Sequence, residues 1–113
     1  MKYNRWEKYE FEVSQLGLGT VALGMPYGLG NLPPPEERHS IALIHRALEA
    51  GINYIDTASV YGISEEVVGK ACVSVSSQPM ICTKVTVPQV GDVRMLIQQF
   101  GQQLEKSRSL LAM

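Results

Sequence analysis

A short apolar run that ends in a carboxylate constrains the fold of this chain more than any other feature. The segment Ile-Asn-Tyr-Ile before Asp56 is rich in β-branched and aromatic residues, and Gly51 precedes it. The pattern predicts a strand over 52–56, followed by a loop that carries Tyr61 and ends at Gly62. Because loops at the carboxyl ends of parallel strands open on one crevice in α/β proteins, Asp56 and Tyr61 are the first candidate functional residues.

The rest of the chain alternates strand signals with helix signals, which is typical of an α/β fold. These further elements are predicted as strands over 13–18 and 80–85 and helices over 36–50, 64–72 and 93–111. Right-handed crossovers would place the three strands parallel, in the order in which they occur in the sequence. Polar and apolar residues alternate over 1–13, which predicts a short β-hairpin before the first strand.

Local signals define the ends and faces of the predicted helices. Ser64 is expected to cap the second helix, and Glu65 and Glu66 favour its first turn through the helix dipole. Asp92 is expected to cap the third helix. That helix carries an apolar face at helical spacing, which we expect to be buried in the core: Val93, Leu96, Ile97, Phe100 and Leu104.

A second fold has to be weighed, because the residues from Gly17 to Ala22 match the dinucleotide-binding pattern G-x-G-x-x-A. That pattern requires a helix to begin at the second glycine, so that its amide groups and dipole face the pyrophosphate. The residues that follow are rich in glycine and proline, and they predict a long loop over 21–35 with no helix. The sequence therefore disfavours a Rossmann fold.

Length and composition exclude several classes of protein. A chain of 113 residues with 45% hydrophobic and 19% charged residues is expected to form one globular domain. A net charge of -1 gives no electrostatic footprint for nucleic acid or an anionic membrane. No apolar run approaches the ~20 residues that cross a bilayer, and the charged first ten residues do not resemble a signal peptide. We therefore expect a cytoplasmic protein with no nucleic-acid or membrane partner.

The cysteines and histidines give no sign of a metal site. Cys72 and Cys82 fit neither a disulfide framework nor the spacing of zinc ligands, so we expect both to be reduced and buried. His39 and His45 invite a catalytic role, because histidine is the commonest general acid in enzymes. Both lie in the middle of the first predicted helix, far from any strand end, and we expect both to be structural.

Two motifs in order carry a resemblance to a known family. The run Gly-Ile-Asn-Tyr-Ile-Asp-Thr-Ala at 51–58, with Tyr-Gly at 61–62 and Ser-Glu at 64–65, resembles the strand-two signature of aldo/keto reductases. Ile-Cys-Thr-Lys-Val at 81–85 resembles their strand-three signature, and Leu-Gly-Leu-Gly-Thr at 16–20 their first strand. The resemblance implies that residues 1–113 form the first three βα units of an incomplete TIM (β/α)₈ barrel, preceded by a β-hairpin.

Strand parity brings the candidate residues together. Side chains alternate along a strand, so Asp56 and Lys84 are expected on the same face of two neighbouring strands. Such strands lie about 4.8 Å apart. An ion pair is then expected at the rim of the sheet, with Tyr61 folded back over the lysine. A phenol is a weak acid with a pKa near 10, and an ammonium within ~4–6 Å stabilises its anion.

The resemblance implies a role for each of these residues in an oxidoreductase that reduces aldehydes, ketones or sugars to alcohols, or catalyses the reverse. Tyr61 is implied as the general acid, Lys84 as the residue that makes the phenol more acidic, and Asp56 as the partner of Lys84. Gly19 and Thr20, together with Asp56, are implied to lie near the nicotinamide of NADPH or NADH. The implied partners are this cofactor and a small-molecule carbonyl or sugar substrate.

The resemblance also implies groups that this sequence lacks. The family completes its site with a histidine at the end of a fourth strand, a position that His39 and His45 do not match. Three of eight βα units leave open sheet edges, so we expect the chain alone to be inactive and to self-associate. The open side of the sheet is expected to expose Leu16, Leu18, Ile52, Tyr54, Met80 and Cys82. The alternative is a non-catalytic α/β module that binds a partner or cofactor through this surface.

Overall fold

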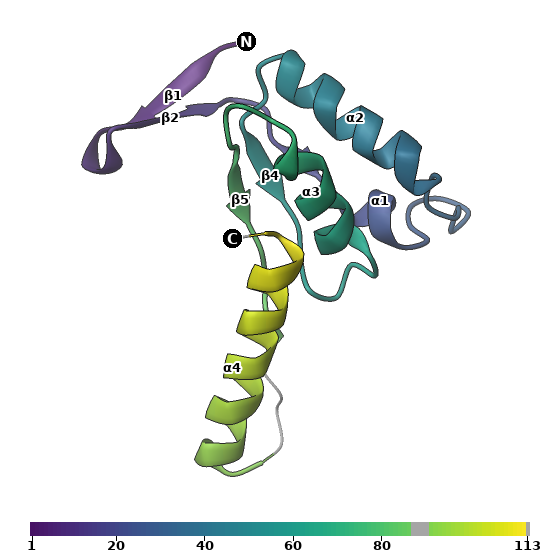
Figure 1. Cartoon of the computed structure of the whole chain (residues 1–113), viewed down its shortest axis with the longest axis vertical. Coiled ribbons are helices and arrows are strands. Elements are labelled where there is room, and N and C mark those ends of the chain that lie inside the picture. The colour runs from purple at the N-terminus through teal and green to yellow at the C-terminus, as the bar shows by residue number, and fades with distance from the viewer. Residues whose placement is uncertain (87–90, 113) are drawn as a thin grey trace.

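The computed structural model describes residues 1–86 and 91–112 and contains a hairpin, a small sheet and a set of helices (Figure 1). The strands are β1 Tyr3–Trp6, β2 Phe11–Ser14, β3 Leu18–Gly19, β4 Tyr54–Asp56 and β5 Met80–Cys82. The helices are the 3₁₀ turn η1 Glu7–Tyr9, α1 Val21–Gly24, α2 Glu37–Glu49, α3 Ser64–Val73 and α4 Val93–Leu110. None of the helices among these residues is long and apolar enough to cross a membrane.

The three central strands confirm the predicted order. β3, β4 and β5 are parallel and lie side by side in the order of the sequence. Leu18, Ile55 and Ile81 lie level with one another across this sheet. β1 and β2 form the expected antiparallel hairpin, which projects away from the sheet in Figure 1. Within the described ranges the parallel sheet is open, with β3 and β5 at its two edges, and no closed barrel is formed.

The first predicted strand is divided between two sheets. Residues 13–18 were expected to be continuous, but Val13 pairs with Asn4 in the hairpin and only Leu18–Gly19 join the parallel sheet. Asn53 explains the break, because its side-chain oxygen accepts from the Ser14 amide at 2.8 Å and its own amide donates to Ser14 Oγ. These bonds fix the end of the hairpin, and the chain turns before it enters the sheet.

The segment over 21–35 is not a loop throughout, as the sequence had predicted. α1 begins directly after β3, and its turn is closed by the Met25 amide, which donates to the Val21 carbonyl. Leu23 is 7% exposed and anchors the turn in the core. Burial of one leucine therefore outweighs the surrounding glycine and proline at this position.

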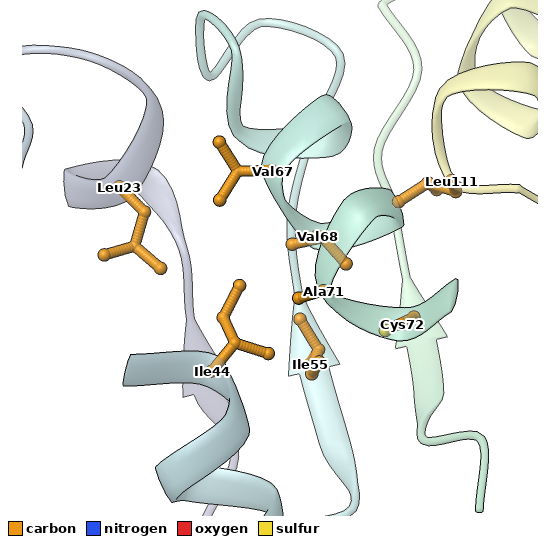
Figure 2. Packing of buried hydrophobic residues seen from close by; sticks show 8 residues of the cluster. All are labelled: Leu23, Ile44, Ile55, Val67, Val68, Ala71, Cys72 and Leu111. Atoms are coloured by element: carbon orange, nitrogen blue, oxygen red, sulfur yellow. The ribbon is translucent and has the colours of Figure 1, made fainter. Parts of the chain in front are cut away.

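The core lies on the side of the sheet that the helices cover, and α3 is at its centre. Figure 2 shows the apolar cluster, whose members come from α1, α2, β4, α3 and the end of the chain after α4: Leu23, Ile44, Ile55, Val67, Val68, Ala71, Cys72 and Leu111. Each fully buried aliphatic side chain stabilises the fold by roughly 1.5–3 kcal/mol. The expected burial of Cys72 is confirmed, whereas Cys82 is only half-buried; both thiols are free.

The opposite side of the sheet is less exposed than the sequence suggested. Ile52, Tyr54 and Met80 are half-buried, and Leu16, which is exposed, lies before β3 and outside the sheet. Leu18 does not belong to this side, because it lies level with Ile55 and packs against the helix-side core. The one-residue error follows from the break in the first strand, since a shift of one residue moves a side chain to the other face.

The apolar face of α4 is not part of the core, which corrects the prediction. Val93, Ile97, Phe100 and Leu104 are 71%, 66%, 41% and 40% exposed, and of the five predicted residues Leu96 alone is half-buried. Only the carboxyl end of the helix packs closely, against α3, and the amino end extends beyond the sheet (Figure 1). Burial thus follows the neighbours that a helix meets, and a regular apolar stripe alone does not supply them.

Candidate active site

An ion pair at the carboxyl edge of the sheet brings two predicted residues together. Asp56 ends β4 level with Cys82 of β5, and Lys84 follows two residues later on the same side. Lys84 Nζ lies 2.6 Å from Asp56 Oδ1. The carboxylate of Asp56 raises the pKa of Lys84 above its ordinary value, and the Tyr61 phenol adds to the rise. Lys84 therefore stays cationic at neutral pH.

Tyr61 lies over this pair. Lys84 Nζ is 5.0 Å from the centroid of the Tyr61 ring, within the range of a cation–π contact. The loop between β4 and α3 is tied to the end of β5, because the amide and hydroxyl of Ser59 donate to the Lys84 carbonyl at 3.0 and 3.1 Å. The loop therefore folds back over the lysine as predicted, and a phenol, an ammonium and a carboxylate meet at one rim.

The two residues predicted to lie near a cofactor occupy different environments. Gly19 lies level with Asp56, and a Cβ added there would meet no atom within 4 Å, so the space beside the strand end is open. Thr20 is fully buried, and its hydroxyl donates to the Asp56 carbonyl at 3.0 Å. The cofactor contacts of both residues stay predictions.

Ser64 has a different place from the predicted helix cap. The cap position is Ile63, and Ser64 is the first residue of α3, with its side chain fully buried. Its hydroxyl lies 2.6 Å from Thr20 Oγ1 and 3.0 Å from Thr57 Oγ1. Sequence reasoning assigned this serine to its own helix, because nothing local indicates a partner 44 residues away.

Glu65 is more than a first-turn carboxylate. It is 4% exposed, and its two oxygens accept from Thr83 Oγ1 at 2.6 Å and from Ser107 Oγ at 3.0 Å. It therefore links α3 to the residue before Lys84 and to α4. The available signal was that a charged side chain follows Ser64 directly, at the helix end nearest the predicted site. Glu66 instead pairs with Lys70 at the surface.

Other titratable residues lie apart from the ion pair or beside it without a predicted role. His39 is exposed, and His45 Nε2 lies 2.9 Å from the Ala71 carbonyl, where it joins α2 to α3. The contact of His45 fits its expected structural role, whereas the role of His39 stays a prediction. Tyr54 lies on the same side of β4 as Asp56, and its contact with the Cys82 thiol raises the pKa of its phenol.

Comparisons with known proteins match the sequence and the fold of this chain. A family model, that of the aldo/keto reductase family, matches residues 15–113. Aldo-keto reductase YhdN of Bacillus subtilis (strain 168) is 44% identical over 73 residues, which cover 63% of this chain and 21% of YhdN. The crystal structure of PA4992 from Pseudomonas aeruginosa superposes with a TM-score of 0.74 at 31% identity, over 97% of this chain and 43% of that one.

A third relative is the glycerol dehydrogenase AKR11B4 from Gluconobacter oxydans, with a TM-score of 0.71 and 29% identity over 97% of this chain and 36% of the enzyme. This chain therefore spans between 21% and 43% of the length of the three relatives. The strand order, the two motifs and the match over 15–113 agree. This chain belongs to the aldo/keto reductase family.

Proposed function

We propose that this chain carries the proton-donating part of the active site of an NAD(P)H-dependent carbonyl reductase. Tyr61 is the general acid, Lys84 makes it a better one, and Asp56 holds Lys84 in place. One observation carries the proposal: Lys84 lies 2.6 Å from Asp56 and 5.0 Å from the Tyr61 ring, at the edge of the sheet where α/β enzymes place their chemistry.

The chemistry follows from the charges of the three groups. When Tyr61 donates its proton to a carbonyl oxygen, the phenolate that remains lies next to the Lys84 ammonium, which stabilises it. The Asp56 carboxylate keeps that ammonium charged and aimed, since it raises the pKa of Lys84. In the reverse direction the phenolate accepts the proton of an alcohol.

The residues at the strand ends fit one part of the proposed cofactor, NADPH or NADH. The space beside Gly19 is open, and the Asp56 carboxylate lies level with it, so a flat polar ring fits there. Gly19, Asp56 and the backbone of Thr20 would lie beside the nicotinamide, which supplies hydride to the carbonyl carbon when bound. The substrate class is an aldehyde, ketone or sugar, and the cytoplasm is the proposed setting.

A chimera with a longer relative tests the proposal. Residues of this chain would replace the matching segment of YhdN, and NADPH consumption would be followed with a generic aldehyde. We expect activity that falls by ~10²-fold or more in Tyr61→Phe and in Lys84→Met, because general acid catalysis contributes ~10²–10⁴-fold. Tyr27→Phe is the matched control, since Tyr27 lies in the loop after α1 and is 56% exposed. A chimera that keeps full activity without the Tyr61 hydroxyl would disprove the assigned role.

A second candidate function is a non-catalytic module that binds a partner through the open side of the sheet. The half-buried Tyr54 and Met80 favour it, since apolar surface seeks cover. We expect the 113-residue chain alone to consume no NADPH and to self-associate, as measured by an enzyme assay and size-exclusion chromatography. A monomer that turns over an aldehyde, and loses this activity in Tyr61→Phe, would contradict both expectations.

A further inference from the structure

A chain of buried hydroxyls runs beneath the candidate site. Thr57 Oγ1 lies 3.0 Å from Ser64 Oγ, and Thr20 Oγ1 donates to the Asp56 carbonyl at 3.0 Å. Ser64 Oγ donates to Thr20 Oγ1 at 2.6 Å and also lies 3.1 Å from the Thr20 carbonyl oxygen. All three hydroxyl residues are fully buried. Because the protons of Ser64 and Thr20 are already committed, Thr57 donates to Ser64, and every hydroxyl in the chain is satisfied.

Ser64 occupies the middle of this chain and connects three elements. It begins α3, Thr20 follows β3 and Thr57 follows β4. The Thr20 amide also donates to the Asp56 carbonyl at 3.0 Å, so the ends of β3 and β4 are joined by backbone and side chain together. The start of α3 is therefore held against the strand end that carries Asp56.

The loop that carries Tyr61 ends at Ser64. The Ser64 amide donates to the Tyr61 carbonyl at 3.1 Å, and the Ile63 amide donates to the Gly24 carbonyl at 3.1 Å. Gly24 has no room for a side chain, because an added Cβ would overlap the Tyr61 carbonyl and Ser64. A movement of Ser64 thus moves the backbone of Tyr61 directly.

We propose that Ser64 is a positioning residue that, through Thr20 and Thr57, holds Tyr61 over the ion pair of Asp56 and Lys84. This rests on the function proposed above and adds a residue that acts through others without touching the reacting groups. If the start of α3 shifts, buried hydroxyls lose their partners, and a buried polar group without a partner is unfavourable. The hydroxyl chain therefore selects one position of the loop.

The test is a measurement of the Tyr61–Lys84 contact in the 113-residue chain itself. In chain labelled at the lysine ε-carbons, a nuclear Overhauser effect between the Lys84 methylene and the Tyr61 ring reports their distance. A pH titration of the same signals gives the Lys84 pKa, which depends on the charged and polar groups beside the ammonium. The signal of Lys84 is identified as the one that is missing in Lys84→Arg. Ser64→Ala should remove the Overhauser effect and lower the Lys84 pKa toward its ordinary value. The substitution changes no charge, so such a shift reports geometry.

Two controls separate positioning from a general loss of structure. Ser40→Ala deletes the same atom from another fully buried serine, whose hydroxyl has no hydrogen-bond partner in the part of the chain that the structure describes, so it should leave both readouts unchanged. Lys70 is an internal reference in every sample, since its pKa is raised by Glu37 and Glu66 away from the site. In Ser64→Ala we expect Lys70 to keep its raised pKa.

A second pair of variants keeps the shape and changes only the hydroxyl. Thr20→Val removes the bonds of the Thr20 hydroxyl but leaves Ser64 the Thr20 carbonyl as an acceptor at 3.1 Å, so it should weaken the Overhauser effect less than Ser64→Ala does. Thr20→Ser keeps all of these hydrogen bonds and should retain the effect. An unchanged Tyr61–Lys84 contact in both Ser64→Ala and Thr20→Val overturns the proposal. So does a joint loss of the Lys70 and Lys84 shifts, because Ser64 would then support the fold and not the site.

This result is independent of the catalytic assignment. The contact is measured without cofactor or substrate, whereas the role of Tyr61 is measured by turnover in the chimera. A contact that depends on Ser64, found together with a chimera that is active without the Tyr61 hydroxyl, would uphold the positioning role and refute the proposed function.

Discussion

Helices α3 and α4 differ in how many of their residues are buried against other elements. α3 has ten residues, of which seven are buried, while α4 has eighteen and only Ser107 is buried within it. α3 lies against β4, α1, α2 and the end of α4, whereas the amino end of α4 lies beyond the sheet (Figure 1). Among residues 1–86 and 91–112, those around the candidate site therefore pack against other elements, whereas those of the amino end of α4 stay largely exposed.

The polar side chains of the two helices repeat this contrast. Ser64 and Glu65 of α3 are buried with short hydrogen bonds to residues from other elements. Gln99 and Gln103 of α4 each bury a side-chain oxygen that has no hydrogen-bond partner among the described residues. A buried acceptor without a donor destabilises a structure, so α4 is held less firmly than α3.

The largest expected difference comes from removing one isoleucine on each side of the comparison. Ile44 of α2 is fully buried against the cluster around α3, while Ile97 of α4 is 66% exposed. Ile44→Ala should lower the free energy of unfolding by about 2–5 kcal/mol, because it leaves a cavity. Ile97→Ala should change it by less than about 0.5 kcal/mol, as measured by urea denaturation. Equal losses would mean that the stripe on α4 is covered in solution.

A glycine in each helix gives the next largest contrast, with opposite signs. An added Cβ at Gly69 of α3 would overlap the backbone carbonyl of Leu110, whereas one at Gly101 of α4 would meet nothing within 4 Å. Gly69→Ala should destabilise the chain by about 1–3 kcal/mol, because the end of α4 must move away. Gly101→Ala should stabilise it by about 0.4–1 kcal/mol, because alanine loses less backbone entropy in a helix. A thermal melt of both variants measures the two effects, and loss of stability in Gly101→Ala would contradict the exposed position of α4.

The candidate site was predictable where local pattern and strand parity were enough. The apolar run before Asp56 defined a strand end, and the alternation of side chains placed Lys84 on the same side of the next strand. The order of the three parallel strands followed from the connections between them. No contact with distant residues was needed for these inferences.

The remainder depended on contacts between residues far apart in the sequence. Asn53 interrupts the first strand through hydrogen bonds to Ser14, 39 residues earlier. The buried Glu65 accepts a hydrogen bond from Ser107, 42 residues later. The apolar residues of α4 have the same helical spacing as those of a buried face, so their exposure cannot be predicted from the spacing alone. A sequence pattern specifies which face of a helix is apolar, but the partner that covers it is a property of the fold.

A smaller effect is expected at the amino end of α4, where the helix depends on its own cap. Asp92 Oδ1 accepts from the Met95 amide at 3.0 Å, while α3 has no side-chain cap and is held by Ser64 instead. Asp92→Ala should cost about 1 kcal/mol of helix stability and lower the helical circular dichroism signal. Asp92→Asn is the matched control, since asparagine caps a helix nearly as well. If only the helical signal changes and the Tyr61–Lys84 contact is kept, the amino end of α4 is independent of the candidate site.

The smallest effect on stability is expected from the ion pairs. The pair at the site connects two strands, whereas the pair in α4 lies within one helical turn. Lys84 pairs with Asp56 across two strands, whereas Arg108 pairs with Glu105 three residues earlier. Because Asp56 raises the folded-state pKa of Lys84, this pair stabilises the fold fully below the ordinary lysine pKa of about 10.4. The stabilisation is lost as the pH rises through the folded-state pKa.

Urea denaturation at pH 8 and at strongly alkaline pH should therefore show a decline in the wild-type chain that is smaller in Asp56→Asn. The pair is nearly half exposed, so solvent screening keeps its contribution small. Glu105→Gln should leave the decline as it is, because an exposed pair within one turn adds little and arginine stays charged. An unchanged decline in Asp56→Asn would show that the loss of stability at alkaline pH comes from other groups, such as Lys70. The Asp56–Lys84 pair would then not contribute to the difference in stability between the site and α4.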